Sequence, residues 1–190
     1  MGGEIIFMNI EILKMSSSEF KMIIYQKFKG KIFHITNEKN YKNILQSGAI
    51  LATNNIENPN INWGSESSQS YFRTKNCISV CDLFHNKNEN KIIVAMDKYS
   101  CWNPNSVVKD KVGYYLVLKE SIYDKCITWN SLSQNEWLGT QIVHDLESGI
   151  ADKILLSDIE YIIKLVTTEQ SRKEIENIYD RLLNKSKEQK

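Results

Sequence analysis

Apolar and polar positions alternate along this chain in short stretches that predict strands more often than helices. The stretch EIIFMNIEIL at residues 4–13 is rich in isoleucine, as buried or half-buried strands commonly are. Similar stretches predict further strands at residues 31–36, 49–52, 76–83, 91–96, 113–118 and 160–166, with one more candidate at 126–130. The strands do not alternate regularly with helices, so the order favours an α+β fold over a doubly wound parallel sheet.

Two helices are expected early in the chain, each with its own start and stop signals. Ser16 and Glu19 have the spacing of a capping box, which opens a helix that Gly30 can end. Asn37 is a suitable cap for a second helix that Gly48 ends. The residues expected on the buried faces of these helices recur at helical spacing: Phe20, Ile23, Ile24 and Phe28 in the first, and Tyr41, Ile44 and Leu45 in the second.

The C-terminal part of the sequence predicts a strand, a loop, a one-turn helix and a final strand within residues 141–166. Either Ser157 or Asp158 can start the one-turn helix. Residues 169–187 then predict a longer helix, because apolar residues recur there at spacings of three, four, seven and eight positions.

Residues 53–75 differ from their surroundings, being polar and rich in asparagine, with Pro59 and Gly64 among them. A long loop inside a domain is usually either a functional lid or a disordered segment. Trp63 and Tyr71 argue against full disorder, since disordered segments contain few aromatic residues.

Composition narrows the function classes without choosing one. The net charge of +1 gives no reason to expect an extended phosphate-binding surface. The four cysteines lack zinc-site spacing and the three histidines lack helical metal-site spacing, so we expect reduced thiols and no metal. Because the chain has neither a membrane-length apolar run nor a convincing secretory signal, we expect a cytoplasmic protein without a membrane partner.

His34 is the first candidate for chemistry. It alternates with Phe33 and Ile35, so its side chain leaves the strand on the opposite face, where Thr36 also lies. Taken alone, a histidine in this position is typical of one bonded to a backbone group. The order that follows, from strand through His-x-Thr to a helix and a glycine turn, makes His34 and Thr36 candidates for binding a ligand at a cleft.

The segment before the strand at 76–83 provides a second group of candidates. Tyr71 offers an aromatic face for a flat heterocycle, and Arg73 offers a bidentate fork for a pyrophosphate. Ser79 can hydrogen-bond a ribose or orient a carboxylate. The structural alternatives are a loop anchor for Tyr71, a solvated charge for Arg73 and an ordinary strand residue for Ser79.

Glu147 is the candidate for catalysis. We expect it just past a strand, where its carboxylate can project into a cleft and stabilise an oxocarbenium-like transition state. Glu136, Asp145 and Glu160 compete for the role, although Glu160 begins an apolar strand and Glu136 precedes a tryptophan. A capping role in a loop is the structural alternative for Glu147.

Three stretches of the sequence form a recognisable set. The first is FHIT followed by NYKNILQSGAIL, the second is YFRTKNCISVCDLF, and the third is ESGIADK followed by ILLSDIEYII. Together they resemble the ADP-ribosyltransferases, and are similar to the compact bacterial and phage-associated branch that includes the DarT-type toxins. In the second stretch, both Tyr71 and Ser79 match the middle motif. Leu155 departs from the family pattern, which often has proline there.

The resemblance implies a single domain with an ADP-ribosyltransferase-like split β-sandwich, short helices and a C-terminal helix. It covers residues 31–166, leaving 1–30 as an N-terminal extension and 168–190 as the C-terminal helix. NAD would be the substrate, with His34 at the ribose, Tyr71 at the nicotinamide and Glu147 catalytic.

Two functions follow as hypotheses. The first is an NAD-dependent mono-ADP-ribosyltransferase that modifies a macromolecular acceptor, either protein or nucleic acid. The alternative is a non-catalytic binding module or inhibitor on the same fold, acting in a phage–host or toxin–antitoxin system. The sequence leaves the oligomeric state open.

Overall fold

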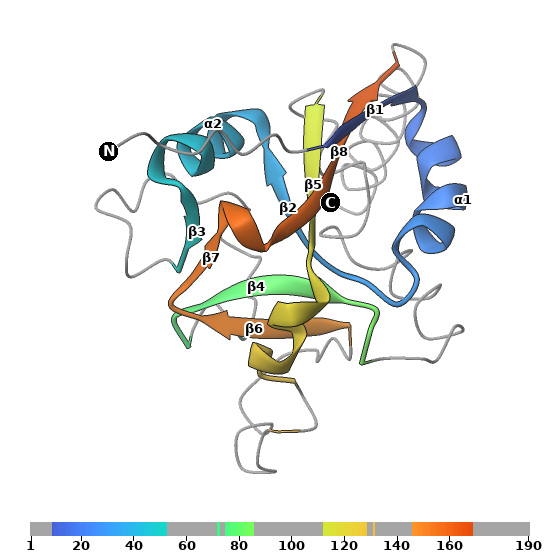
Figure 1. The fold of residues 1–190 in the computed structure, drawn as a ribbon. Helices are drawn as coiled ribbons and strands as arrows, with labels where there is room; N and C mark the ends of the chain where they lie inside the picture. Colours follow the sequence, from blue (N-terminus) through green and yellow to red (C-terminus); the bar gives the residue numbers. More distant parts are fainter. Residues whose placement is uncertain are drawn as a thin grey trace, which may run out of the picture.

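The computed structural model describes residues 9–52, 72, 75–85, 112–128, 131 and 146–168, and these residues form an α+β fold (Figure 1). A mixed sheet of six strands has the order β1-β8-β5-β2-β4-β6, and β3 and β7 form a separate two-stranded sheet. The strands are β1 Ile10–Met15, β2 Ile32–Asn37, β3 Ala49–Leu51, β4 Cys77–Asp82, β5 Val112–Leu118, β6 Glu147–Ala151, β7 Lys153–Leu155 and β8 Ile159–Thr167. The helices are α1 Ser17–Phe28 and α2 Glu38–Ser47, with 3₁₀ helices at Glu120–Lys125 and Leu156–Asp158.

The predicted ends of both helices are confirmed. Ser16 and Glu19 form the reciprocal capping box at the start of α1. The Asn37 side chain accepts from the amide of Asn40 at 2.8 Å, and Gly48 ends α2 with a φ of 75°. The prediction that Leu45 lies on the buried face of α2 is wrong, because its side chain is exposed.

The N-terminal elements belong to the main sheet and its core. β1 pairs with β8 in parallel over six residue pairs, from Ile10 opposite Ile162 to Met15 opposite Thr167. Phe20, Ile24 and Phe28 of α1 are buried in the same cluster as residues of β2, β4, β5 and β8. The described residues before position 31 therefore complete the sheet rather than extend away from it.

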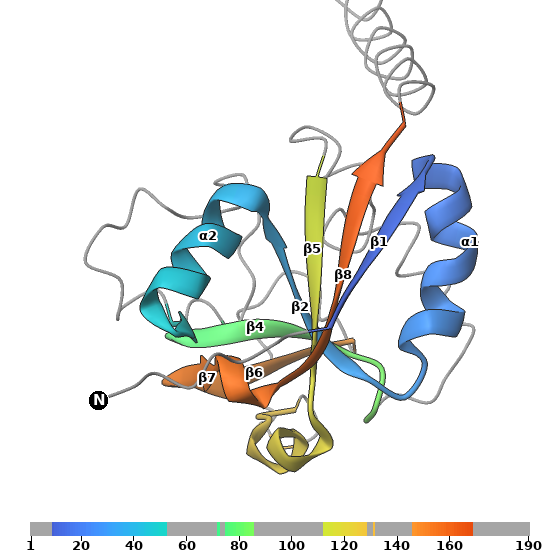
Figure 2. The ribbon, with the colours of Figure 1, turned by 45° about the horizontal axis from the view of Figure 1, so that its top comes forward.

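The six-stranded sheet opens between β2 and β4. β2 pairs with β5 over five residue pairs, but it pairs with β4 only at Ile32 opposite Asp82 and Phe33 opposite Cys81. Beyond that point the two strands diverge, and β4 and β6 run across the direction of β2, β5 and β8 (Figure 2). His34 is the first residue of β2 past the point of divergence.

Apolar side chains cover both faces of this sheet. One cluster surrounds Phe28, Phe33 and Tyr115 on the α1 side, and the other surrounds Tyr41, Tyr114 and Ile162 on the α2 side. The two clusters fix the strands from opposite sides, and thereby fix the residues at the opening between β2 and β4.

Several predicted elements shift or fall outside the described residues. Glu147 is the first residue of β6, not a residue past a strand, because Cys81 on β4 offers it a pairing partner. The one-turn helix begins at Leu156, before the predicted start, and Asp158 accepts the Leu155 amide from the far end of the turn at 2.9 Å. At 126–130, the described residues contribute only an isolated bridge between Ile127 and Gly149. The predicted strand 91–96 and helix 169–187 lie outside the described residues.

Candidate functional site

Three of the predicted site residues are joined by hydrogen bonds across β2, β4 and β6. The Ser79 hydroxyl donates to Oε1 of Glu147 at 2.6 Å, and the Nδ1 atom of His34 lies 3.0 Å from the carbonyl oxygen of Ser79. These contacts connect residues 68 and 45 positions apart in the chain. The fold thus gathers His34, Ser79 and Glu147 at the opening between β2 and β4.

Strand alternation explains why Ser79 and Glu147 meet. Glu147 lies opposite Cys81 and Ser79 lies opposite Gly149, so all four residues share one face of the β4–β6 pair. Glu147 is 9% exposed, and Asp82 is the other charged residue that is buried in the described part of the chain. A buried carboxylate held by a short hydrogen bond has a fixed orientation, as a catalytic carboxylate requires.

The contact of His34 determines which ring nitrogen carries the proton. A backbone carbonyl oxygen can only accept, so Nδ1 of His34 donates to Ser79. In the neutral ring, Nε2 then carries the lone pair. His34 thus makes the bond to a backbone carbonyl that is expected of a structural histidine. That carbonyl belongs to Ser79, whose side chain donates to Glu147.

Thr36 lies two residues further along β2, in the interior. It is 2% exposed and faces Tyr114 of β5 across the pair of strands. Within the described part of the chain, Thr36 makes no hydrogen bond to His34, Ser79 or Glu147. The structure therefore places it beside the site without connecting it to the carboxylate.

Tyr71 and Arg73 lie outside the described residues, whereas Phe72 between them is described and buried. A Cβ atom added to Gly149 would lie only 2.3 Å from Cδ1 of Phe72, so the aromatic ring packs directly on the backbone of β6. Gly149 is on the Ser79–Glu147 face, so Phe72 borders the site. Sequence reasoning missed this contact, although a glycine two residues after a candidate catalytic glutamate is a signal for close packing.

Of the competing acidic residues, only Glu160 is described. Its carboxylate is 41% exposed and lies 3.0 Å from Nζ of Lys31 on the surface. This ion pair accounts for Glu160 and separates it from the buried site. Glu136 and Asp145 lie outside the described residues.

A second serine–carboxylate pair lies on the opposite face of the same two strands. Ser148 donates a short hydrogen bond to Oδ2 of Asp82, a residue that is 1% exposed. Oδ1 of Asp82 also accepts the backbone amides of Phe84 at 3.0 Å and His85 at 2.9 Å. Sequence reasoning did not single out Asp82, because a buried aspartate at the end of an apolar strand has no distinctive spacing.

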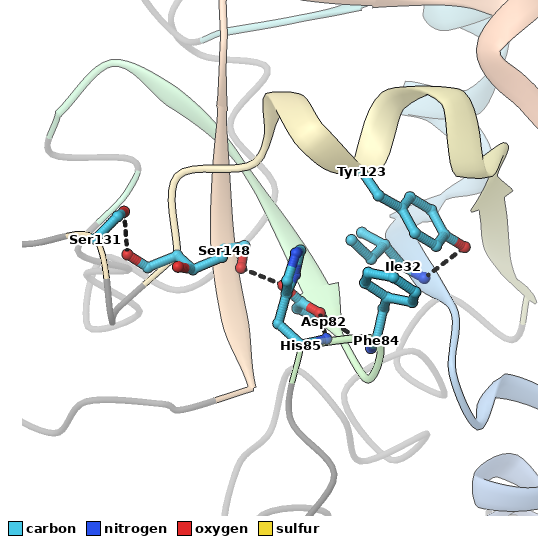
Figure 3. Close-up of polar contacts among 8 residues, drawn as sticks. Ile32, Asp82, Phe84, His85, Tyr123, Ser131 and Ser148 are labelled. Carbon is cyan, nitrogen blue, oxygen red and sulfur yellow. Dashed lines mark hydrogen bonds and ion pairs between the residues drawn. The ribbon is translucent and has the colours of Figure 1, made fainter.

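His85 completes this second group. Its Nδ1 atom lies 2.7 Å from Oδ2 of Asp82, and the ring of Phe84 meets the imidazole edge-on at 4.9 Å (Figure 3). Ser148 and His85 both contact Oδ2 of Asp82, and Figure 3 shows all three side chains gathered together. Because Ser148 is buried and bonds the carboxylate instead of the imidazole, these residues are not arranged as a serine nucleophile with its base.

Two of the described thiols, Cys77 and Cys126, are poorly suited to nucleophilic chemistry. Burial, together with the negative charges of Asp82 and Asp124, raises the pKa of Cys126 to about 12. Burial also raises the pKa of Cys77. Both therefore remain thiols at neutral pH. Among the described residues, no group of three histidine, cysteine, aspartate or glutamate side chains gathers to hold a metal ion.

Comparison with models of known protein families gave no match, and comparison with curated proteins gave none either. None of the helices in the described residues combines the length and apolar character that crossing a bilayer requires.

Proposed function

We propose that this protein is an NAD-dependent mono-ADP-ribosyltransferase that acts on a macromolecular acceptor. The observation that carries the proposal is the chain of contacts from His34 to Ser79 to Glu147 at the place where β2 and β4 diverge. The same three residues lie in the stretches of the sequence that resemble ADP-ribosyltransferases.

Glu147 would act at the bond between nicotinamide and ribose. Breaking that bond builds positive charge on the ribose carbon, and a fixed carboxylate stabilises such charge without reorganising. Ser79 holds Oε1 of Glu147 at 2.6 Å, so it restrains the carboxylate while the ribose carbon passes through the transition state.

His34 would bind the ribose. When the ring is neutral and Nδ1 donates its proton to Ser79, Nε2 is a hydrogen-bond acceptor of the kind that suits a sugar hydroxyl. The same bond ties the orientation of the ring to the strand that carries Ser79. His34, which would bind the ribose, and Glu147, which would stabilise its transition state, would thus both be held by Ser79.

Release of nicotinamide from NAD is the direct test of this proposal. We expect release by the wild-type protein, with or without added acceptor, and about a 100- to 1000-fold lower rate for Glu147→Gln, which removes the charge but keeps the shape. Glu160→Gln is the matched control, because it makes the same change at a surface ion pair. Ser79→Ala should lie between the two, since it removes the restraint on the carboxylate and leaves the charge.

Two results would contradict the proposal. One is the absence of nicotinamide release with every acceptor tried, including protein and nucleic acid extracts. The other is an equal rate for wild type and Glu147→Gln. A thermal shift with NAD separates a protein that binds NAD without reaction from one that does not bind it, since a ligand at 100 times its dissociation constant stabilises a fold by about 2.7 kcal/mol.

A further inference from the structure

We infer that Asp82 is a positioning residue for Glu147, acting from the opposite face of the β4–β6 pair. The effect of Asp82 on catalysis rests on the proposed function, whereas its effect on the position of Glu147 rests on the contacts alone. Asp82 bonds both residues that flank Glu147 in the chain. Its backbone amide donates to the carbonyl oxygen of Leu146 at 2.7 Å, and its carboxylate accepts from the hydroxyl of Ser148.

The position of Glu147 explains why it needs such support. It is the first residue of β6, and β6 is the last strand in the order of the described sheet. On the other side of β6, the described residues contribute only the bridge from Ile127 to Gly149, two residues after Glu147. The end of a strand is where local opening is expected to begin. A contact on each side of Glu147 opposes that opening at the place where the carboxylate must be fixed.

Asp82 is itself held firmly enough to act as this support. It is 1% exposed, and it accepts from two backbone amides and from Nδ1 of His85 in addition to Ser148. A buried carboxylate with four donors is costly to move, because each lost bond would leave a polar group without its partner. Hydrogen bonds to the Asp82 carboxylate therefore hold both the turn at residues 83–85 and the start of β6.

The two serine–carboxylate pairs then act as one unit. Glu147 and Ser148 are consecutive, so their side chains leave β6 on opposite faces. Ser79 of β4 restrains Glu147 on one face, and Asp82 of β4 restrains Ser148 on the other. Both contacts oppose rotation of the β6 end, which would carry the Glu147 carboxylate away from Ser79.

The test uses Ser148→Ala, with Ser47→Ala as the matched control. Ser47 also donates through its hydroxyl, to the carbonyl oxygens of Ile44 and Ala49, but it lies at the end of α2. Hydrogen exchange of the Asp82 amide reports opening of its bond to Leu146. We expect this exchange to be about tenfold faster in Ser148→Ala and unchanged in Ser47→Ala, as the loss of a bond to a charged group predicts.

Kinetics provide the second readout. We expect Ser148→Ala to lower kcat for nicotinamide release by about tenfold and to leave KM for NAD within about twofold, because misplacing the carboxylate affects the transition state more than binding. Asp82→Asn, which keeps the shape of the side chain, should lower kcat in the same way if Ser148→Ala folds poorly.

The outcomes separate this inference from the proposed function. Exchange at Asp82 that does not change in Ser148→Ala overturns the inference, whether or not the protein is active. Faster exchange with an unchanged kcat also overturns it, since Asp82 would then serve stability alone. An inactive wild type rejects the proposed function, while the exchange comparison still decides whether Asp82 supports the strand end that carries Glu147.

Discussion

The two faces of the β4–β6 pair carry the same chemical motif in opposite settings. On one face a serine of β4 donates to a glutamate of β6, and on the other a serine of β6 donates to an aspartate of β4. The Asp82 carboxylate accepts from four donors, two of which are backbone amides of the turn that follows β4. Glu147 instead accepts from Ser79, whose carbonyl oxygen contacts His34 at the opening of the sheet. The surroundings of a buried carboxylate, more than its burial, distinguish a structural acid from a candidate catalytic one.

Replacing the two carboxylates should have unequal effects on the free energy of unfolding, and this is the largest difference we expect. Asp82→Ala should lower the free energy of unfolding by about 3 kcal/mol, since it leaves four donors without their acceptor. Glu147→Gln should change it by less than about 1 kcal/mol, because the amide oxygen still accepts from Ser79. Denaturant titrations measure both, with Asp82→Asn as an intermediate. Equal losses for Asp82→Ala and Glu147→Gln would remove the distinction between the faces.

The close packing on the Glu147 face is the next target. Gly149→Ala should lower the free energy of unfolding by about 1–3 kcal/mol, because the new methyl group would meet the ring of Phe72. In a Phe72→Ala background the same change should cost much less, so the two substitutions should couple in a double-mutant cycle. Additive effects would show that the ring does not limit the space at Gly149.

Two buried tyrosines in the core also differ in the hydrogen bonds of their hydroxyl groups. The hydroxyl of Tyr123, on the α2 side, accepts from the Ile32 amide at 3.1 Å and donates to the Leu118 carbonyl at 3.2 Å. Tyr115, on the α1 side, is fully buried, and its hydroxyl has no hydrogen-bond partner among the described residues.

Removing the two hydroxyls should therefore have different effects on the free energy of unfolding. Tyr123→Phe should lower the free energy of unfolding by about 1–2 kcal/mol, because it leaves a buried amide and a buried carbonyl unpaired. Tyr115→Phe should be neutral or stabilise the fold by up to about 1 kcal/mol. Thermal or denaturant unfolding of the pair measures the difference, and a clear loss in Tyr115→Phe would mean that its hydroxyl has a partner.

Alkaline pH should weaken the fold gradually through Cys126. Its pKa is raised from 9.0 to about 12 by burial, so between these values the folded chain keeps a proton that the unfolded chain has lost. This contribution to stability is fully present below pH 9 and is lost as pH rises toward 12. One proton corresponds to at most about 1.4 kcal/mol per pH unit. Cys126→Ala should flatten the fall in unfolding free energy above pH 9, and an unchanged slope would show that Cys126 does not contribute.

Local signals predicted local structure in this chain. Ser16, Glu19, Asn37 and Gly48 mark helix ends by chemistry that involves neighbours three or four positions away, and the structure confirms each. Leu45 was misassigned because helical spacing alone does not say how wide the buried face is.

The site was only partly predictable, because its contacts depend on strand register. The sequence identified His34, Ser79 and Glu147 as candidates, but their hydrogen bonds depend on β4 lying between β2 and β6. Asp82 and Phe72 were missed for the same reason, since nothing near them in sequence indicates a partner on β6. Tyr71 and Arg73 remain predictions.

The parallel pairing of β1 with β8 has a consequence for how the chain is made. Sequential synthesis delivers β1 long before its partner strand, which begins only at Ile159 and lies between β1 and β5 in the sheet. A nascent chain on the ribosome therefore carries β1 without this partner until β8 has emerged. Pairing between strands that are far apart in sequence slows folding. Until β8 is available, the unpaired edge of β1 can pair with other chains and promote aggregation. Truncation before residue 159 should yield an insoluble product rather than a smaller folded one.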